Sequence, residues 1–243
     1  MKIGFLGTGI IATAVVHGIA GDGHHICVSE RNADKANHLA ATYDNVMVAT
    51  NQNVVDESEV IFLGLMPEVA ASILPSLSFK PGQIIISFIA ALSLEQVGEL
   101  VAPAQARALM LPFPNIAYGG SVIPMIGDQA IVKAIFGANN TLTVLKDQSE
   151  MDALLCAQAV LSPAAKLVQD AAIWLEQNGV DQGRGEPFLR MLVASNLTQT
   201  PASQLLAALN TPGGYNQRLR QHMDQEGVPT ILAAGLDALK SSR

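Results

Sequence analysis

Two glycines one residue apart, near the start of the chain, constrain its fold more than any other feature. Residues 2–6 read as a short buried strand, the segment Gly7-Thr8-Gly9-Ile10-Ile11-Ala12 follows the pattern G-x-G-x-x-G/A, and a helix is expected over residues 13–20. In this pattern the first glycine permits a tight turn and the second lets a pyrophosphate approach the backbone, while the small third residue lets the helix lie against the strand. The phosphates then lie at a helix N-terminus, where unpaired N–H groups and the dipole favour an anion. All six residues are therefore expected to bind a dinucleotide.

A second strand, expected around Cys27, ends in Ser29-Glu30-Arg31, about 20 residues past the turn, where such folds select the ribose. Glu30 can accept hydrogen bonds from both ribose hydroxyls, which favours NAD. Ser29 and Arg31 can instead hold a 2′-phosphate, which favours NADP. We expect NADP as the cofactor and keep NAD as the alternative. The helix that follows, over residues 33–43, is expected to be capped by Asn32.

Strand and helix signals continue to alternate over the first half of the chain. Apolar strands are expected near residues 46, 59–66, 83–90 and 110, with Pro67 opening one helix and Ser93 capping another. Apolar strands alternating with helices indicate a mostly parallel sheet covered on both faces, with ligands at the carboxyl ends of its strands. Besides the glycine turn, the residues expected to line the site at this edge are Leu65, Met66 and Pro67, residues 89–91 with Ala90 as a cofactor contact, and residues 112–115. We place this nucleotide-binding domain at residues 1–147.

After about residue 148 only helices are expected, so residues 148–243 form a second, all-helical domain. Its first stretch, residues 149–179, is a long helix with an interruption expected at Pro163, and apolar residues occupy nearly all its sides. A helix that is apolar all round is buried, and in a small domain a partner chain is the expected cover. We therefore expect a homodimer or higher homo-oligomer formed through these helices.

Composition excludes several other classes. The net charge of -7 argues against a surface for nucleic acid or anionic membranes, and the longest strongly apolar stretches reach about half of the ~20 residues that a membrane-spanning helix needs. Glycines inside the first apolar run argue against an export signal. Two distant cysteines, Cys27 and Cys156, match no metal spacing and fit a reduced, cytoplasmic setting. His24 and His25 have no third partner in evidence, so no metal site is expected.

Motifs spread over nearly the whole chain resemble those of the pyrroline-5-carboxylate reductase family. The opening is similar to its G-x-G-x-M-A turn, residues 65–68 to its V-K-P-Q, and residues 86–91 to its S-I-A-A-G. Thr211-Pro212-Gly213-Gly214-Tyr215-Asn216 is similar to its S-P-G-G-T-T and is the most specific match. The resemblance implies an N-terminal Rossmann-type, doubly wound domain and a C-terminal helical dimerisation domain. It also implies NAD(P)H-dependent reduction of a cyclic imine carboxylate to proline.

The chain departs from the family in the substrate half. Phe113 and Pro114 replace the Asn and Thr of its M-P-N-T-P, Met66 stands where a lysine is usual, and Tyr215 and Asn216 replace two threonines. The resemblance therefore transfers better for the cofactor half than for the substrate half, and it leaves open a different imine or a related hydride transfer.

Hydride transfer to an imine requires orientation rather than an acid–base triad, since the nicotinamide supplies the chemistry. A carboxylate-binding niche is still needed. We assign it to the turn Pro212-Gly213-Gly214, in which the N–H groups of the two glycines are expected to face outward at the start of a helix. Asn216 is expected to donate one more hydrogen bond. Tyr215 is a candidate to hydrogen-bond or protonate the substrate, although it can equally fill volume at a dimer contact.

Two other functions remain open from the sequence. A β-hydroxyacid dehydrogenase on the same plan would use a general-base lysine on the long helix, where Lys166 lies. A non-catalytic, dinucleotide-binding regulatory protein would fit the loss of polar residues from the pocket. His222 is a further candidate acid, with exposure on a helix as the simpler interpretation. Arg184 and Arg190 read as surface charges that can also steer an acidic substrate.

Overall fold

The chain divides into two compact units, Met1–Met151 and Asp152–Arg243. The computed structural model describes residues 1–241, apart from the side chain of Gln182. The division lies four residues beyond the boundary expected from the sequence, because α7 (Gln148–Ala157) begins in the first unit and continues into the second. The two units are taken separately below.

The first unit is built on one eight-stranded sheet with the order β3-β2-β1-β4-β5-β6-β7-β8. The pairing is parallel except between β6 and β7, which are antiparallel. The first six strands follow the doubly wound Rossmann order, which confirms the expected fold class. The strands are β1 (Lys2–Leu6), β2 (His25–Ser29), β3 (Val46–Ala49), β4 (Val60–Leu63), β5 (Ile84–Ser87), β6 (Gln105–Met110), β7 (Val122–Gly127) and β8 (Thr141–Val144).

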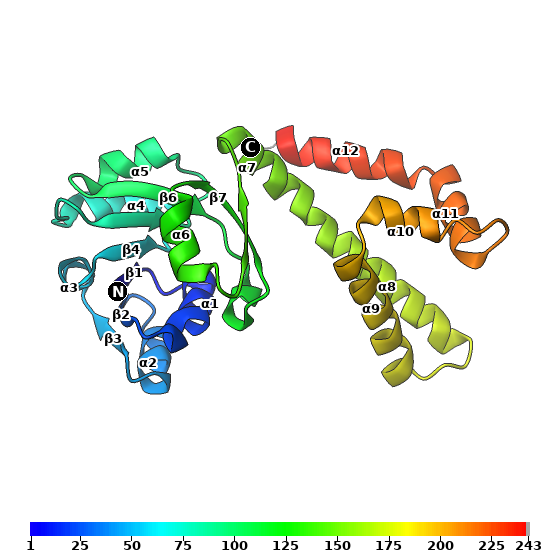
Figure 1. Cartoon of the computed structure of the whole chain (residues 1–243), viewed down its shortest axis with the longest axis horizontal. Coiled ribbons are helices and arrows are strands. Elements are labelled where there is room, and N and C mark those ends of the chain that lie inside the picture. Colours follow the sequence, from blue (N-terminus) through cyan, green and yellow to red (C-terminus); the bar gives the residue numbers. More distant parts are fainter. Residues whose placement is uncertain (242–243) are drawn as a thin grey trace. The chain divides into compact units, whose positions relative to one another are not determined.

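Helices cover both faces of this sheet (Figure 1). The three expected starting residues are confirmed, since Asn32 caps α2, Pro67 is the first residue of α4, and Ser93 forms a capping box with Gln96. The helices are α1 (Ile10–Ile19), α2 (Ala33–Thr42), α3 (Asn51–Glu57), α4 (Pro67–Ile73), α5 (Leu94–Val101) and α6 (Gln129–Phe136), with short 3-10 turns η1 (Ala20–Asp22), η2 (Leu74–Ser76) and η3 (Pro114–Tyr118).

Two apolar cores hold the layers together, one on each face of the sheet. One core joins the sheet to α1, α2 and α6, and Phe62 lies in it with ring centroids 4.9 Å from Phe5 and 5.9 Å from Phe136. The other joins the sheet to α3, α4 and α5 and includes the fully buried Leu63 and Val97. Because both faces are covered, the central strands are apolar on both sides, as their sequences indicate.

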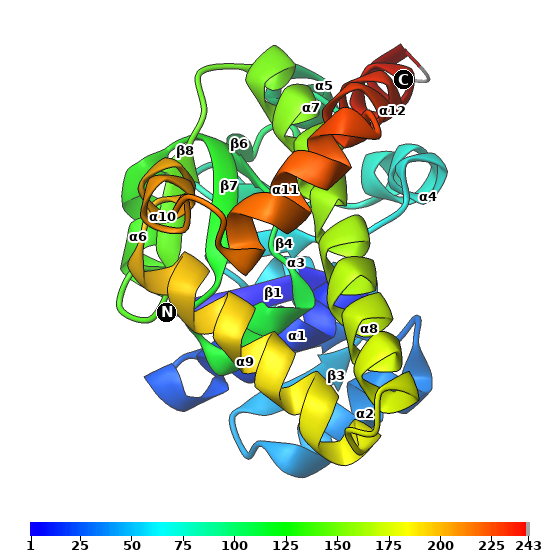
Figure 2. The same ribbon diagram turned by 90° about the vertical axis from the view of Figure 1, so that its right-hand side faces the viewer.

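The second unit is all-helical. Its helices are α8 (Leu161–Gln177), α9 (Gln182–Gln199), α10 (Ala202–Ala208), α11 (Tyr215–Gln225) and α12 (Val228–Ser241). α8 and α9 lie side by side as a hairpin in both views (Figures 1 and 2). Pro163 does not interrupt the long helix as expected, because it lies in the first turn of α8, where a missing N–H is tolerated. The irregularity comes earlier, at the 3-10 turn η4 (Gln158–Val160).

Large apolar side chains lie exposed on this second unit. Trp174 and Phe188 are each 61% exposed, and Met191, Leu197 and Ile231 are exposed to a similar degree.

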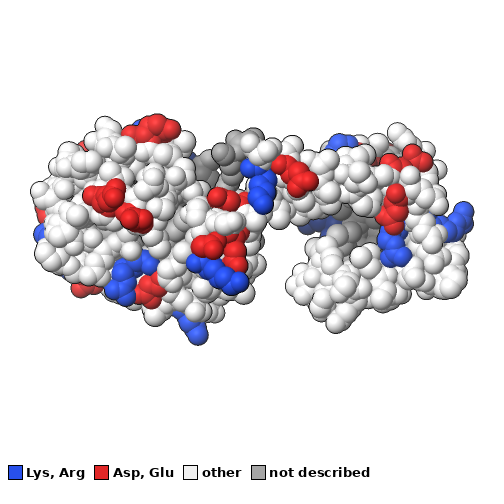
Figure 3. All heavy atoms as spheres, turned by 90° about the horizontal axis from the view of Figure 1, so that it is seen from above, with Lys and Arg blue, Asp and Glu red and all other residues white. Residues whose placement is uncertain are grey.

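The stretch Gln148–Gln177, with a mean hydropathy of 1.3 over its most apolar part, is long and apolar enough to cross a membrane by length and composition alone. Core helices of soluble proteins can have the same length and composition. On the face seen in Figure 3, lysines and arginines are scattered in small groups among uncharged residues.

Candidate functional site

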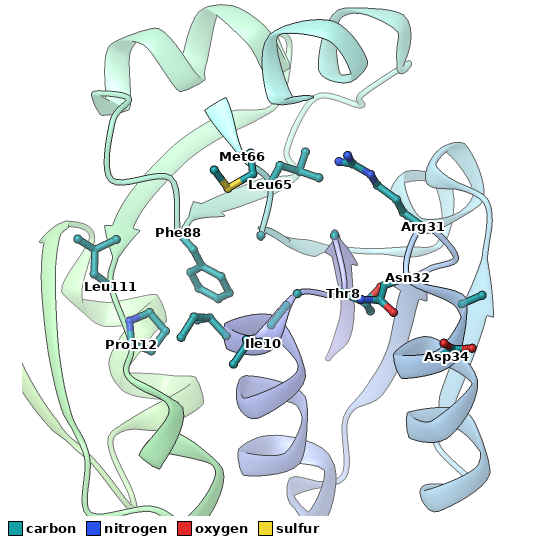
Figure 4. A pocket seen from close by; sticks show the side chains of 16 residues that line it. Thr8, Ile10, Arg31, Asn32, Asp34, Leu65, Met66, Phe88, Leu111 and Pro112 are labelled. Atoms are coloured by element: carbon teal, nitrogen blue, oxygen red, sulfur yellow. The ribbon is translucent and has the colours of Figure 1, made fainter. Parts of the chain in front are cut away.

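A pocket of about 770 Å³ lies at the carboxyl ends of the strands in the first unit. Its walls come from the segments that follow β1, β2, β4, β5 and β6, which is the edge where such sheets bind ligands. Phe88, Leu111 and Pro112 lie on one side, and Arg31, Asn32 and Asp34 lie on the other (Figure 4). The lining residues are Gly7, Thr8, Gly9, Ile10, Ile11, Ala12, Arg31, Asn32, Ala33, Asp34, Gly64, Leu65, Met66, Phe88, Leu111 and Pro112.

The glycine turn forms the floor of this pocket. Gly7 has φ +95°, and a Cβ there would lie 2.4 Å from the carbonyl oxygen of Gly64, so no other residue fits without strain. Gly9 has nothing within 4 Å of the position that a Cβ would take, so its backbone faces open space. Ala12 is buried where α1 lies against the Gly64 segment. The turn is therefore shaped to admit a group close to Gly9.

Helix α1 begins at Ile10, three residues earlier than expected, and Gly9 is its N-cap with no side-chain cap. The first N–H with a backbone partner is that of Thr13, which donates to Gly9 at 3.0 Å. The N–H groups of Ile10, Ile11 and Ala12 are thus available at the pocket floor. A dinucleotide pyrophosphate fits this arrangement of open backbone and uncapped helix N-terminus.

Ser29 does not line the pocket. It is fully buried, its hydroxyl oxygen accepts the Gly7 N–H at 2.8 Å, and its carbonyl oxygen accepts the Thr8 hydroxyl at 3.0 Å. This corrects the expectation that Ser29 holds a ribose phosphate, because its hydroxyl already satisfies the buried turn. Thr8 is buried as well, and its hydroxyl donates to the Ser29 carbonyl within the turn rather than facing the pocket.

Arg31 is part of the pocket wall, whereas Glu30 is not. Arg31 lines the pocket, is exposed, and makes no hydrogen bond or ion pair within residues 1–241, while its side chain extends toward Leu65 (Figure 4). Glu30 is exposed and absent from the pocket wall. Asn32, Ala33 and Asp34 were not predicted as site residues. They lie at the start of α2, where Asn32 was expected only as a helix cap, and that signal could have placed this helix start at the pocket. At the end of the pocket formed by the segment after β2, the guanidinium of Arg31 thus has no partner among the described residues.

The opposite end of the pocket is apolar. It is formed by Met66, Phe88, Leu111 and Pro112, and the exposed Met66 is the N-cap of α4, while Leu65 lies between this end and Arg31 (Figure 4). Two further expected contacts lie outside the wall. Pro67 is the first residue of α4, and the Ala90 carbonyl accepts a hydrogen bond from the side chain of Gln148 at 3.3 Å. Phe88 lies within the 86–91 motif, but no role in the site was predicted for it. Only its position directly after β5 identifies it as a residue of the pocket wall.

The glycine-rich segment of the second unit is a turn between α10 and α11. Gly213 has φ +74°, which favours glycine. Its N–H donates to the Gln217 side-chain oxygen at 2.8 Å, and the Gly214 N–H donates to the Thr211 carbonyl at 3.0 Å. The expectation that these two N–H groups face outward is therefore wrong, because each has an internal acceptor. Pro212 has no N–H to contribute.

The available donors lie immediately after this turn. Helix α11 has no side-chain cap, and its first internal backbone bond is donated by Arg218 to Gly214 at 3.0 Å. The N–H groups of Tyr215, Asn216 and Gln217 have no partner in the described chain. Tyr215 is 90% exposed, and the Asn216 side chain is exposed. A candidate anion site exists here, two residues later than the sequence indicated.

Other candidate groups have structural explanations. Lys166 is exposed on α8 and forms an ion pair with Asp170 one turn later, which leaves it poorly suited as a general base. His222 is exposed on α11. Burial raises the pKa of the Cys27 thiol to about 11, with the Glu57 charge adding to the effect, so this thiol is unreactive. Within residues 1–241 no group of three or more His, Cys, Asp or Glu side chains is arranged to hold a metal.

Comparison with known proteins agrees with the fold and with the sequence resemblance. A family model described as "NADP oxidoreductase coenzyme F420-dependent" matches residues 2–91. Pyrroline-5-carboxylate reductase 1 of Bacillus spizizenii is 24% identical over 255 residues, which cover 99% of this chain and 82% of that protein.

Solved structures agree over the same length. The 1-pyrroline-5-carboxylate reductase of Streptococcus pyogenes superposes with a TM-score of 0.82 at 20% identity, over 100% of this chain and 97% of that one. The pyrroline carboxylate reductase of Plasmodium falciparum, solved with NADP bound, gives a TM-score of 0.78 at 14% identity, over 100% and 96% of the two chains. These structures share the fold of this chain along its whole length, and the curated relative bears out the resemblance to the pyrroline-5-carboxylate reductases.

Proposed function

We propose that this relative of the pyrroline-5-carboxylate reductases reduces a cyclic imine carboxylate with NADPH, and that 1-pyrroline-5-carboxylate, which would yield proline, is the first substrate to test. One observation carries the proposal. A single chain combines a glycine-turn pocket open at Gly9 with a second turn that leaves the N–H groups of Tyr215, Asn216 and Gln217 without partners in the described residues. The first arrangement suits a pyrophosphate and the second suits a carboxylate.

In this proposal the residues of the chain bind and orient, and the nicotinamide, when bound, supplies the hydride. The backbone at Gly9 and the first turn of α1 hold the pyrophosphate, while Met66, Phe88 and Leu111 exclude water from the apolar end. The N–H groups of α11 and the Asn216 amide hold the substrate carboxylate. Hydride transfer requires the imine carbon to come within ~3.5 Å of the nicotinamide C4.

No protein acid is needed at the apolar end of the pocket. Arg31 and Asp34 are the titratable residues in its described lining, and both lie at the opposite end (Figure 4). A protonated imine accepts hydride readily, so we propose that the substrate enters in that form. Tyr215 remains a candidate donor from the second unit.

NADP is the proposed cofactor because of the charges at the ribose end. Arg31 lines the pocket with a guanidinium that has no partner within residues 1–241, and Glu30, the residue that would favour NAD, is not part of the wall. A guanidinium beside the N-terminus of α2 suits a 2′-phosphate. The structure with NADP bound among the similar proteins supports the same choice.

A homodimer is the proposed assembly. The exposed apolar side chains of α8, α9 and α12 form a surface of the kind that a second copy covers, since monomers rarely expose large apolar patches. The covering chain is proposed to be a second copy, in line with the cover expected for a long helix that is apolar on nearly all sides.

The decisive experiment is a spectrophotometric screen of the purified protein with NADPH and NADH against cyclic imine acids of different ring size. We expect oxidation of NADPH with 1-pyrroline-5-carboxylate. Turnover of a β-hydroxyacid instead, abolished by Lys166→Ala, would replace this proposal with the dehydrogenase alternative. Tight NADPH binding without turnover of any imine or hydroxyacid would favour a regulatory protein.

A further inference from the structure

Three side chains tie the Thr211–Gly214 turn to the helices on either side of it. The Asn210 side-chain oxygen accepts hydrogen bonds from Gln217 Nε2 at 3.2 Å and from Arg220 Nη2 at 2.6 Å. Gln217 Oε1 accepts the Gly213 N–H at 2.8 Å. Arg220 Nη1 donates to the Leu206 carbonyl, in the last turn of α10, at 3.2 Å. One guanidinium therefore connects the end of α10, the residue before the turn and, through Asn210 and Gln217, the turn itself.

The charge of Arg220 is not neutralised by the chain. Both of its acceptors are neutral oxygens, and no carboxylate pairs with it anywhere in the described residues. The side chain is half-buried, so solvent screens it less than it would a fully exposed arginine. Its position at the end of α10 is favourable, because a cation suits a helix C-terminus.

Through the Asn210 oxygen that it shares with Gln217, the same guanidinium is connected to the first turn of α11, whose first three N–H groups have no partner in the part of the chain described here. A helix N-terminus carries partial positive charge and is unfavourable for a cation. Two positive features thus meet at one turn with no anion supplied by the protein. An acidic ligand at this place relieves that repulsion and satisfies the open donors.

We infer that Arg220 is a positioning residue for the substrate carboxylate. It acts through Asn210 and Gln217 to fix the turn, so that the donors of α11 stay open, and its charge favours an imine that carries a carboxylate over one that does not. This inference rests on the proposed function. The guanidinium itself is engaged by Asn210 and Leu206 and is not assigned a contact with the reacting atoms.

The test compares 1-pyrroline-5-carboxylate with 1-pyrroline, the same ring without the carboxylate, using the full-length protein and NADPH. We expect Arg220→Gln to raise KM for the acid about tenfold, with little change in kcat, because a uniform binding interaction is lost. The KM for 1-pyrroline should change less than about twofold. Arg220→Lys, which keeps the charge but lacks the planar fork, should fall between wild type and Arg220→Gln.

Arg218→Gln is the matched control. Arg218 lies on the same helix two residues away, about 200° around the axis, and makes no hydrogen bond or ion pair within residues 1–241. It should leave both KM values unchanged. Should Arg220→Gln fail to fold by circular dichroism, Asn210→Ala removes the acceptor that holds Arg220 and Gln217, and it should raise KM for the acid more than KM for 1-pyrroline.

The outcomes separate the inference from the proposed function. A wild-type protein that reduces no imine overturns both. A wild type that reduces 1-pyrroline-5-carboxylate, together with an Arg220→Gln variant that behaves like Arg218→Gln, overturns the inference alone. An equal rise in KM for both imines also overturns it, since a purely structural role would not distinguish them.

Discussion

Gly7 and Gly9 belong to one turn, yet their replacement by alanine should have different consequences. A Cβ at Gly9 meets nothing within 4 Å and projects into the space proposed for the pyrophosphate. Gly9→Ala should therefore leave the thermal midpoint of the cofactor-free protein unchanged and weaken NADPH binding by tenfold or more, about 1.4 kcal/mol, as measured by fluorescence titration.

Gly7→Ala provides the contrast, because its Cβ would lie 2.4 Å from the Gly64 carbonyl oxygen at a φ of +95°. It should lower the thermal midpoint even without cofactor. If Gly9→Ala binds NADPH as wild type does, the pyrophosphate does not approach this backbone.

Arg31 is the residue on which the cofactor preference depends. Arg31→Ala removes the unpaired guanidinium from the pocket wall, so it should weaken NADPH binding about tenfold or more and leave NADH binding nearly unchanged. Isothermal titration with both cofactors measures this directly. Arg184→Ala, an exposed arginine of the second unit, is the control. An equal loss of affinity for both cofactors would contradict a 2′-phosphate contact.

For single residues, the sequence predicts a role correctly where the role follows from the size of the residue or from its backbone freedom. It does not predict a role that depends on which group is the hydrogen-bond partner. Gly7, Gly9 and Ala12 could be assigned because the turn dictates their size. Ser29 could not, since nothing in the pattern indicates that its hydroxyl accepts the Gly7 N–H at 2.8 Å. Nor does the sequence indicate that the Gly213 N–H donates to the side-chain oxygen of Gln217, four residues later.

Among the elements, α1 approaches η3 closely at Gly18. A Cβ at Gly18 would lie 2.5 Å from the backbone oxygen of Ile116, whereas Gly21, just past the end of the same helix, has nothing within 4 Å. Gly18→Ala should therefore destabilise the protein by about 1–3 kcal/mol through overpacking. Gly21→Ala should be neutral or slightly stabilising. Urea unfolding of both variants checks this, and equal stabilities would show that η3 moves aside freely.

The contact between α1 and α2 should make stability depend on pH. His17 Nδ1 is hydrogen-bonded to the Tyr43 hydroxyl at 2.8 Å, and burial, with the His38 charge adding to it, lowers the pKa of His17 below 6.5. The folded chain then binds fewer protons than the unfolded chain as the pH falls through 6.5. The free energy of unfolding should therefore decrease over this range.

Thermal midpoints measured from pH 7.5 down to 5 should fall more steeply for the wild type than for His17→Gln. The pKa of His24 is also lowered, mainly by burial, so a residual slope is expected in the variant. His38→Gln should make the wild-type slope shallower, because it removes the neighbouring charge. Identical slopes for wild type and His17→Gln would rule out this contribution.

The sequence predicted helices and strands correctly where an apolar run marked the strand and a cap or proline marked the start of the helix. It failed at β7, where a proline lies inside the strand. The first six strands carry apolar runs, and three of the helices that follow them begin at a recognisable residue, namely Asn32, Pro67 or Ser93. β7 was missed because Pro124 lies in its middle, between two neighbouring strands, a position that ordinarily argues against a strand. The short β8 beside it, only four residues long, offered no independent signal.

For the whole molecule, the exposed apolar surface of the second unit is the feature that requires an explanation. α8, α9 and α12 expose large apolar side chains, and α11 is strongly polar by contrast. A monomer with this surface would be expected to aggregate, whereas a homodimer that covers it would be soluble. Light scattering coupled to size exclusion should therefore give about twice the chain mass of 25.5 kDa.

Charges placed on this surface should disrupt the assembly. Met191→Glu and Leu197→Glu, at exposed apolar positions of α9, should each shift the protein toward monomer or aggregate and lower its thermal midpoint, because an unpaired charge would be buried between the two copies. Gln221→Glu on the polar helix α11 adds the same charge at an exposed site and should leave the mass unchanged. A wild type that elutes as a stable 25.5 kDa species would contradict the dimer, and the apolar face would then need a different partner.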